Sequence, residues 1–462
     1  MEDRYSIMTK KQRAVLLTVL ITAFITPFMG SSMNLCVISI ESEFHTSAAI
    51  VGWVITSFTM ATVALSIPMG KIADVTGRKR ILLTGISGYV ILFFLILFSS
   101  NIWMVLIIRA LQGAAAAMVF ATNNAVLLDA FPDNVRGRML GISVTSTYLG
   151  LSLGPVLGGI LNHAFGWRAI FVVTFVIAVI AWISCFRGVE NDKQKPKENN
   201  HFDLSGNLLF IVAVTVSLYA LTNLSIQRFA WVLLLIGLGF GAFFVRRETR
   251  AADPMIRISM FTKDAAFTLS NIAALLNYGA TFAITYLVSI YLQSIKGFSS
   301  QTAGLILLFM PLLQVIFSPV MGRLSDRIAP YKLATTGMAW NTVGLVFLML
   351  IKADTPLFFI CILLAYLGFG FALFSSPNTN AVLSCVSHHE YGIANAILST
   401  MRTMGQTISM SVVTIIVGIT MGTAALNEAA PETLLRTMHI AFFVFVILSI
   451  AGTFMSLKRK SA

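Results

Sequence analysis

The sequence predicts an all-helical membrane protein with fourteen transmembrane helices, and three observations support this fold class. Of its 462 residues, 57% are hydrophobic and only 11% are charged, whereas a soluble domain carries roughly 25% charged residues. Apolar runs recur along the chain, and each approaches or reaches the roughly 20 residues that cross a bilayer core as a helix. The basic residues gather between these runs, on alternate sides. A soluble fold is therefore excluded.

The apolar runs define the predicted helices in chain order. The first run follows Lys10, Lys11 and Arg13, has full spanning length and precedes no small-residue cleavage site. We therefore expect a retained helix and not a cleaved signal peptide. The fourteen predicted spans cover residues 14–38, 50–70, 81–99, 102–128, 138–162, 169–187, 204–223, 229–245, 265–291, 300–321, 332–351, 356–380, 391–421 and 438–456.

The distribution of basic residues predicts the orientation of these helices. If the N-terminus is cytoplasmic, 25 of the 32 Lys and Arg residues lie on the cytoplasmic side, and only Arg109 and Arg402 lie inside spans. Because basic loops remain in the cytoplasm, we expect a multi-pass protein of the cell membrane with both termini cytoplasmic. The net charge of +13 then reflects topology and attraction to anionic lipid of the bilayer. It requires no nucleic-acid partner.

A polar segment and an internal repeat divide the chain. Residues 188–203, GVENDKQKPKENNHFD, contain little that could pack in a core and predict a solvated cytoplasmic linker. The stretch GKIADVTGRKR at residues 70–80 recurs in degenerate form as GRLSDRIAPYK at residues 322–332. Eight predicted spans separate the copies, whereas a parallel repeat of two six-helix halves requires six. The predicted units are an N-terminal six-helix bundle (1–187), the linker (188–203), two additional helices with a cytoplasmic loop (204–264) and a C-terminal six-helix bundle (265–462).

Three motifs carry a resemblance to a known family. GKIADVTGRKR resembles the loop between the second and third helices of the major facilitator superfamily, and Arg109, Gln112 and Gly113 resemble its fourth-helix motif. The fifth span resembles the antiporter motif of facilitator-type exporters at Gly141, Gly150, Gly154, Pro155, Gly158 and Gly159. With fourteen spans, the chain is similar to the fourteen-span drug/proton antiporter family. The resemblance implies two six-helix bundles that rock around a central site, with two extra helices between them.

The resemblance implies a latch at the cytoplasmic face. Asp74 would meet the N-terminal end of a helix in the other half, and Arg78 would pair with Asp129 at the inner end of the fourth span. Lys79 and Arg80 are better explained as determinants of topology. We expect the first copy of the repeat to carry the gating and the second to be mostly a relic of symmetry. The predicted gating residues are Gly70, Asp74, Gly77, Arg78, Asp129, Gly322 and Asp326.

Two bases lie inside predicted spans. A guanidinium within the bilayer is costly unless it finds partners, so Arg109 and Arg402 are functional candidates. We assign Arg109, Gln112, Gly113 and Arg402 to proton coupling or conformational exchange. Arg109 could instead be structural, tied to Gln112 or to backbone carbonyls of a neighbouring helix. Arg402, with Gln406 one turn further on, could contact substrate.

Glycines recur one helical turn apart in the fifth span. Gly150, Gly154 and Gly158 would give this helix a smooth side that another backbone can approach closely, and Pro155 would bend the helix. The resemblance implies that this interface limits leak and favours export. Ordinary tight packing is the alternative, although the packing would itself be the mechanism.

The predicted membrane interior contains no acidic residue. All 19 acids fall in loops or near span ends, including Glu41 and Glu43 at the outer end of the first span. Relatives that export cationic drugs often keep an acid near the position of Gly30, so this chain is better suited to neutral or anionic amphipathic molecules. As a set, the candidate cavity residues are Phe28, Asn34, Asn123, Tyr148, Asn277, Tyr286, Met310, Gln314, Phe374, Asn378 and Gln406.

These observations predict a secondary active transporter that exports amphipathic small molecules in exchange for protons. A proton-linked carrier of an organic anion, which could be an importer, and a lipid exporter are alternatives. No span contains paired acids, H-E-x-x-H or a nucleophile with its base, so we predict no enzyme. His388, His389 and Glu390 fit a solvated turn better than a metal site. We expect a monomer without cofactor or metal, whose partners are substrate, protons and the lipid bilayer, and whose energy source is the proton gradient.

Overall fold

The computed structural model describes residues 8–189, 203–224, 227–251, 254–386, 391–422, 424–426 and 429–461, and every regular element in this part of the chain is a helix. Thirteen of these helical segments are long and apolar enough to cross a membrane. A further helix, α14 (Pro330–Met349), has 20 residues, which also spans the core of a bilayer. The predicted all-helical membrane fold is therefore confirmed.

Each predicted span of the N-terminal bundle and of the additional pair corresponds to a helix, generally longer than the span predicted from hydropathy. The helices of the N-terminal half are α1 (Lys10–Phe44), α2 (Ala48–Thr76), α3 (Arg78–Leu95), α4 (Ile102–Ala130), α5 (Asp133–Phe165) and α6 (Arg168–Gly188). The additional pair is α7 (Leu204–Thr222) and α8 (Ala230–Glu248), followed by the short helix α9 (Ser259–Lys263).

The C-terminal half contains two interrupted spans. The first runs through α10 (Ala265–Thr281), α11 (Ile284–Ile290) and a π-helical turn, Tyr291–Ile295, and the second through α12 (Ser300–Leu307) and α13 (Phe309–Leu324). Such interruptions are tolerated within a membrane bundle because neighbouring helices satisfy the freed backbone groups. After α14, the remaining helices are α15 (Leu357–Ser384), α16 (Tyr391–Met421) and α17 (Pro431–Leu457).

Local sequence explains several helix boundaries. Thr9 accepts a hydrogen bond from the Gln12 amide, and the Gln12 side chain accepts one from the Thr9 amide, which forms a capping box at the start of α1. Asp264 caps α10 by accepting from the Phe267 amide at 2.9 Å. Gly77 separates α2 from α3 with φ of 105°, a value that residues with side chains rarely adopt. This turn places Arg78 at the first position of α3.

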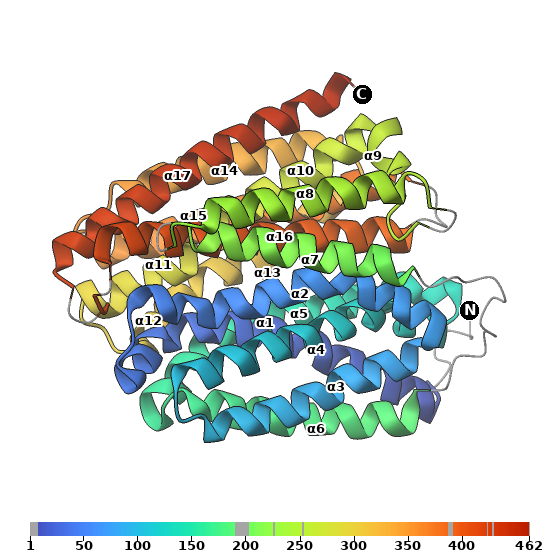
Figure 1. Ribbon diagram of the computed structural model, residues 1–462, viewed down its shortest axis with the longest axis horizontal. Coiled ribbons are helices and arrows are strands. Elements are labelled where there is room, and N and C mark those ends of the chain that lie inside the picture. Colours follow the sequence, from blue (N-terminus) through green and yellow to red (C-terminus); the bar gives the residue numbers. More distant parts are fainter. Residues whose placement is uncertain are drawn as a thin grey trace.

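The helices run lengthwise between two ends of the molecule, and Figure 1 marks both chain termini toward its right-hand side. We call one end the basic end, which contains residues 8–13, 71–80, 129–138, 246–251, 254–264 and 322–332. The opposite end, where α1 leads into α2, is called the base-poor end. It contains residues 44–48, 96–102, 165–168, 295–300 and 349–357.

The two six-helix halves meet in the base-poor part of the bundle. Asn34 Nδ2 of α1 donates to Thr285 Oγ1 of α11 at 3.0 Å, and Ser289 Oγ donates to the Asn34 carbonyl at 2.9 Å. Ser300 Oγ donates to the Gly159 carbonyl at 3.2 Å. Between described residues, the hydrogen bonds that join the halves all lie in this part of the bundle. The halves are therefore closed against each other there.

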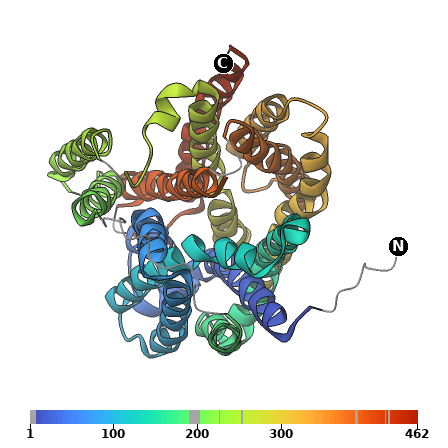
Figure 2. The same ribbon diagram turned by 90° about the vertical axis from the view of Figure 1, so that its right-hand side faces the viewer.

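The additional helix pair contacts both halves from outside. The ring centroids of Tyr219 in α7 and Trp53 in α2 lie 5.6 Å apart. Thr222 of α7 shares a hydrogen bond of 2.6 Å with Ser411 of α16. Figure 2 shows α7 and α8 at the left edge, outside the two bundles. The pair thus adds to the fold without interrupting either half.

Candidate functional site

A polar stripe runs along α16 toward the basic end. Asn395, Ser399, Arg402, Thr403 and Gln406 are partly or fully exposed, although this helix belongs to the membrane-spanning bundle. Polar side chains at membrane depth face a bundle interior or a water-filled cavity. The next four polar residues of α16 are buried: Thr407, Ser409, Ser411 and Thr414. The stripe therefore marks polar surface that is accessible from the basic end and ends near Gln406.

Arg402 lies in this stripe and has few protein partners. Its Nη2 donates to Thr379 Oγ1 of α15, and its guanidinium carbon lies 5.7 Å from the ring centroid of Tyr278 in α10. Its Nε is buried and has no hydrogen-bond partner among the residues described. Arg402 thus lies where α10, α15 and α16 meet, with its Nε donor unused by the residues described.

Arg109, by contrast, is sealed and well partnered, with only 1% of its surface exposed. Its Nε donates to the Val54 carbonyl of α2 at 2.9 Å, and its Nη1 donates to Gln112 Oε1 at 2.9 Å. The guanidinium carbon lies 4.5 Å from the ring centroid of Phe58. A side chain at Gly113 would collide with the Phe58 carbonyl, so this glycine permits close contact of α4 with α2. These contacts agree with the structural alternative for Arg109, and its coupling role stays a prediction.

Charged residues cluster at the turn between α2 and α3. Arg78 Nη1 lies 2.8 Å from Asp129 Oδ2, and Arg78 Nη2 lies 3.4 Å from Asp74 Oδ1. The ion pair implied by the resemblance is therefore present. Asp74 is 54% exposed. Between described residues, no hydrogen bond or ion pair joins it to a helix of the other half, and the latch across the halves stays a prediction.

The second copy of the motif has different partners. Asn380 Nδ2 of α15 donates to Asp326 Oδ1 at 3.1 Å and to Ser325 Oγ at 3.0 Å. These contacts stay within the C-terminal half, and no described ion pair equivalent to Arg78–Asp129 occurs there. Gly322 lies beside Ser376. The asymmetry predicted between the copies agrees with these contacts, although neither gating role is tested by them.

The glycines of α5 face two neighbours. A side chain at Gly150, Gly154 or Gly158 would collide with α1, and Ser32 Oγ of α1 donates to the Gly154 carbonyl at 2.9 Å. Gly159 instead contacts Ser300 at the start of α12 in the other half. Gly141, nearer the basic end, has open space where a side chain would project. Close packing of α5 on α1 explains the spacing of the first three glycines.

Pro155 belongs to the contact between the halves. Its carbonyl lies against Gly304 of α12, where a side chain would collide with it. Helix α5 therefore packs on α1 within its own half through Gly150, Gly154 and Gly158. It packs on α12 of the other half through Pro155 and Gly159. This arrangement is what the glycine-rich motif requires physically.

Most of the candidate cavity residues are buried in helix contacts in this conformation. Asn123 accepts from Thr22 Oγ1 at 2.8 Å inside the N-terminal half, and Asn378 donates to the Ser270 carbonyl at 3.3 Å inside the C-terminal half. Asn34 lies at the contact between the halves. The side chains of Tyr148 and Gln406 are partly exposed. The buried members are Phe28, Asn34, Asn123, Asn277, Tyr286, Met310, Gln314, Phe374 and Asn378.

The tertiary structure buries two acids that sequence reasoning did not place in a site. Glu41 is 1% exposed, and its Oε1 accepts from the Leu426 amide of the other half at 2.7 Å. Glu248 is 3% exposed and accepts from the Ile256 amide at 2.9 Å. Hydropathy puts both acids at helix ends, where exposure is the ordinary expectation. His388, His389 and Glu390 lie outside the described residues.

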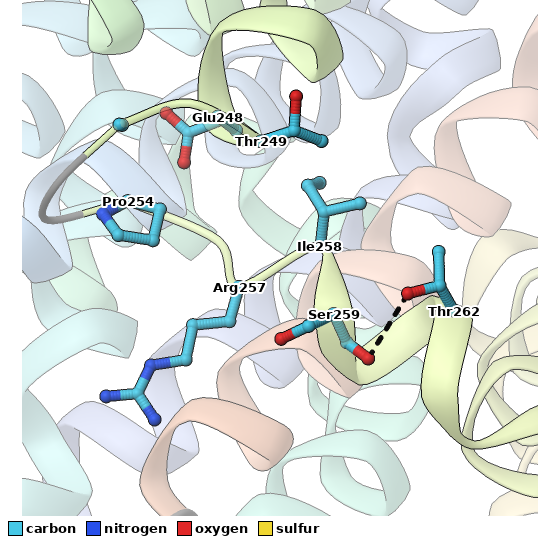
Figure 3. A pocket seen from close by; sticks show the side chains of 8 residues that line it. Glu248, Thr249, Pro254, Arg257, Ile258, Ser259 and Thr262 are labelled. Atoms are coloured by element: carbon cyan, nitrogen blue, oxygen red, sulfur yellow. Dashed lines mark hydrogen bonds between the residues drawn. The ribbon is translucent and has the colours of Figure 1, made fainter.

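A surface pocket of about 310 Å³ lies in the connection between α8 and α9 (Figure 3). Glu248, Arg257 and Thr262 are among its lining residues, and Thr262 Oγ1 donates to the Ser259 carbonyl at 3.5 Å. Among the residues described, those that line it lie between Glu248 and Thr262. The pocket is therefore separate from the polar stripe of α16.

The two six-helix halves meet in one part of the bundle, and polar surface faces the other end. This arrangement is that of a membrane transporter of the two-bundle type. The sequence profile of the Major Facilitator Superfamily matches residues 19–260 and 271–461. The chain therefore belongs to this superfamily, as its motifs predicted.

Several curated relatives cover most of the chain. The riboflavin transporter RibZ of Clostridioides difficile is 30% identical over 405 residues, which are 86% of each chain. The multidrug resistance protein Stp of Mycobacterium tuberculosis is 28% identical over 82% of this chain and 71% of its own. The multidrug efflux pump LfrA of Mycolicibacterium smegmatis is 27% identical over 79% of this chain and 73% of its own.

One solved structure has the same fold along nearly the whole chain. A bacterial homologue of the human lysosomal transporter Spinster, in an inward-facing and unoccupied conformation, matches with a TM-score of 0.70 and covers 97% of both chains. Its sequence identity is 14%, so this likeness concerns the fold alone.

Proposed function

We propose that this protein is a secondary active transporter of the cell membrane that exports amphipathic small molecules by alternating access. One observation carries this proposal: the halves are joined in the base-poor part of the bundle, while polar surface of α16 faces the basic end. A site that is open on one side and closed on the other is what alternating access requires. The basic end would be cytoplasmic because basic loops remain inside.

Export is supported by the packing of α5 and by two relatives. The glycines of α5 contact α1, and Gly159 contacts the other half, as in an interface that controls leak. Stp and LfrA are named for multidrug resistance and multidrug efflux. We further propose that the protein works as a monomer without a cofactor, that it is not an enzyme, and that the proton gradient drives it.

Glu41 is our candidate for the proton-carrying residue. It is buried between the halves at the closed base-poor end, and the Leu426 amide that it binds belongs to the other half. Opening of this end would separate Glu41 from Leu426 and expose the carboxylate to water. A carboxyl group that alternates between these environments changes its proton affinity, which is the requirement for coupling.

A second candidate function is transport of a planar heteroaromatic molecule, and RibZ is the observation that favours it. Riboflavin is amphipathic and carries no charge at neutral pH, so it also fits a membrane interior without acids. The organic-anion carrier remains a further alternative, since both bases inside the spans are compatible with it.

Transport by the purified protein in proteoliposomes tests the proposal. With an imposed proton gradient, we expect accumulation of neutral or anionic dyes, and only weak accumulation of quaternary ammonium compounds. Riboflavin in the same panel distinguishes the second candidate. We expect Arg109→Ala to reduce gradient-driven transport, because Arg109 holds α4 against α2. No movement of any compound would contradict the proposed function, and strong selective export of quaternary ammonium would contradict the argument from the absent acids.

A further inference from the structure

We infer that Arg402 anchors a planar, acceptor-bearing group of the transported molecule. This inference rests on the proposed function and specifies the chemistry of its substrate. The group would present two neighbouring oxygen or nitrogen acceptors in one plane, as a carboxylate does and as the dioxopyrimidine edge of a flavin does.

Arg402 lies at a position that a molecule from the basic end can reach. It belongs to the exposed polar stripe of α16, and its side chain is only partly buried. Within the same stripe, Gln406 lies one turn deeper and Ser399 lies one turn nearer the basic end. A molecule that enters from the basic end would therefore reach Arg402 before the closed part of the bundle.

The guanidinium of Arg402 has hydrogen-bond donors that the described residues do not use. A guanidinium has five N–H donors in one plane, and Arg402 uses one of them on Thr379 Oγ1. Its Nε is buried without an acceptor among the described residues. Buried donors in native structures are nearly always satisfied, so an unsatisfied one indicates a missing water or ligand. No carboxylate of the described chain forms an ion pair with Arg402 either.

Arg109, the other base inside the spans, has a different environment from Arg402. Arg109 is 1% exposed and donates to Val54 and Gln112 within the protein. Both residues are guanidinium groups at membrane depth, and only Arg402 combines partial exposure with unused donors. This combination favours recognition of a substrate over coupling.

Aromatic side chains lie beside the guanidinium of Arg402. The ring of Tyr278 lies 5.7 Å from the guanidinium carbon, and this cation–π contact stabilises the charge without using its N–H donors. Phe371 packs edge-on against Tyr278, with ring centroids 5.2 Å apart. An aromatic wall next to a guanidinium suits a substrate that is planar, largely apolar and rich in acceptors along one edge.

Binding to the full chain in nanodiscs, without any gradient, tests the inference. The probes are riboflavin, a naphthalene carboxylate, and tetraphenylphosphonium, which is a lipophilic cation without acceptors. In Arg402→Ala we expect affinity for riboflavin or the carboxylate to fall about tenfold or more, with tetraphenylphosphonium binding unchanged. In Arg402→Lys we expect the carboxylate to recover more than riboflavin, because lysine supplies charge but no planar fork.

Two controls make the result decisive. Arg436→Ala removes an exposed arginine at the start of α17, and we expect all three affinities to stay at the wild-type value. Thermal unfolding of each variant monitors folding, and Arg402→Lys serves if Arg402→Ala does not fold. The two acceptor probes separate an organic acid from a neutral heteroaromatic as the substrate class.

The inference is overturned if the wild type binds neither acceptor probe, if Arg402→Ala binds both as tightly as the wild type, or if all three probes weaken equally. Failure of the proposed function gives a different result. In that case Arg402-dependent binding persists, but the wild type moves no compound across proteoliposome membranes under a proton gradient.

Discussion

At the scale of single residues, burial separates side chains that look alike in the sequence. Glu41 and Glu43 are two residues apart, and both lie near the end of the first predicted span. Glu43 binds Arg168 at 2.6 Å within the N-terminal half, whereas Glu41 binds the amide of Leu426 in the other half. Only Glu41 is therefore placed to sense the separation of the halves.

Glu41→Gln should uncouple transport from the proton gradient. The glutamine can still accept a hydrogen bond from Leu426, but it cannot bind or release a proton. We expect gradient-driven accumulation to fall about tenfold or more, while exchange of labelled for unlabelled substrate without a gradient continues. Glu43→Gln is the matched control and should keep both activities. Loss of exchange in Glu41→Gln would show a structural role instead.

Asp203 provides a pH-dependent test outside the spans. Its hydrogen bond to Arg247, whose Nη2 lies 2.9 Å away, lowers the pKa of the Asp203 carboxyl to about 2. A lowered pKa in the folded state contributes stability above the unfolded value of about 3.9 and loses it as pH falls toward 2. Asp203 also caps α7 by accepting from the Gly206 amide at 3.0 Å.

We therefore expect Asp203→Ala to lower stability by about 1 kcal/mol at neutral pH. Thermal unfolding in detergent, measured from pH 7 to pH 3, should show a constant difference from the wild type down to about pH 4 and a smaller one below it. A difference that grows with acidification would contradict this assignment.

At the scale of helices, the spacing of small residues determines which surfaces can approach. A Cβ at Gly158 would lie 2.7 Å from the Ser32 Cβ of α1, whereas a Cβ at Gly141 of the same helix has nothing within 4 Å. The two glycines therefore occupy different environments, although the motif includes both. Only Gly158 is required for packing of α5 on α1.

Gly158→Val should destabilise the protein by about 1–3 kcal/mol, because α1 and α5 must move apart to admit the side chain. Gly141→Ala is the matched control and should leave stability unchanged or raise it by up to about 1 kcal/mol, since alanine favours helix more than glycine does. Thermal unfolding of both variants measures these effects. Equal tolerance of the two substitutions would show that α5 does not depend on close packing at Gly158.

At the scale of the whole molecule, function depends on whether the halves separate in the base-poor part of the bundle. Asn34 of α1 and Thr285 of α11 face each other there, with their side-chain atoms 3.0 Å apart. Alternating access requires this contact to break in every cycle. The additional pair α7 and α8 touches both halves, but it covers them from outside.

A cross-link between the halves tests this requirement. With the four native cysteines replaced, Asn34→Cys and Thr285→Cys should be joined by a short thiol cross-linker because the side chains are in contact. We expect transport to be lost almost completely when the link forms and to return when a reducible link is cleaved. Each single variant, treated in the same way, should keep its activity. Undiminished transport by the linked protein would contradict alternating access.

The sequence by itself determined the class of molecule. Spans of about 20 apolar residues, basic loops on alternate sides and a degenerate repeat depend only on composition and order along the chain, and the structure has a helix for every predicted span. The partnership of Arg78 with Asp129 was also predicted, as what the resemblance of the loop motif to the superfamily implies.

Only the tertiary structure decided which polar residues are available for function. Asn123 and Asn378 resemble cavity residues in the sequence, but each forms a hydrogen bond with another helix of its own half. Arg109 and Arg402 are also alike in the sequence, and the fold satisfies the first while it leaves the Nε donor of the second without an acceptor among the described residues. The physical reason is that membrane helices present apolar residues both to lipid and to neighbouring helices, so hydropathy contains little information about which face meets a neighbour. Close packing of small residues determines which face of a helix meets a neighbour, and this face is known only once the helices are assembled.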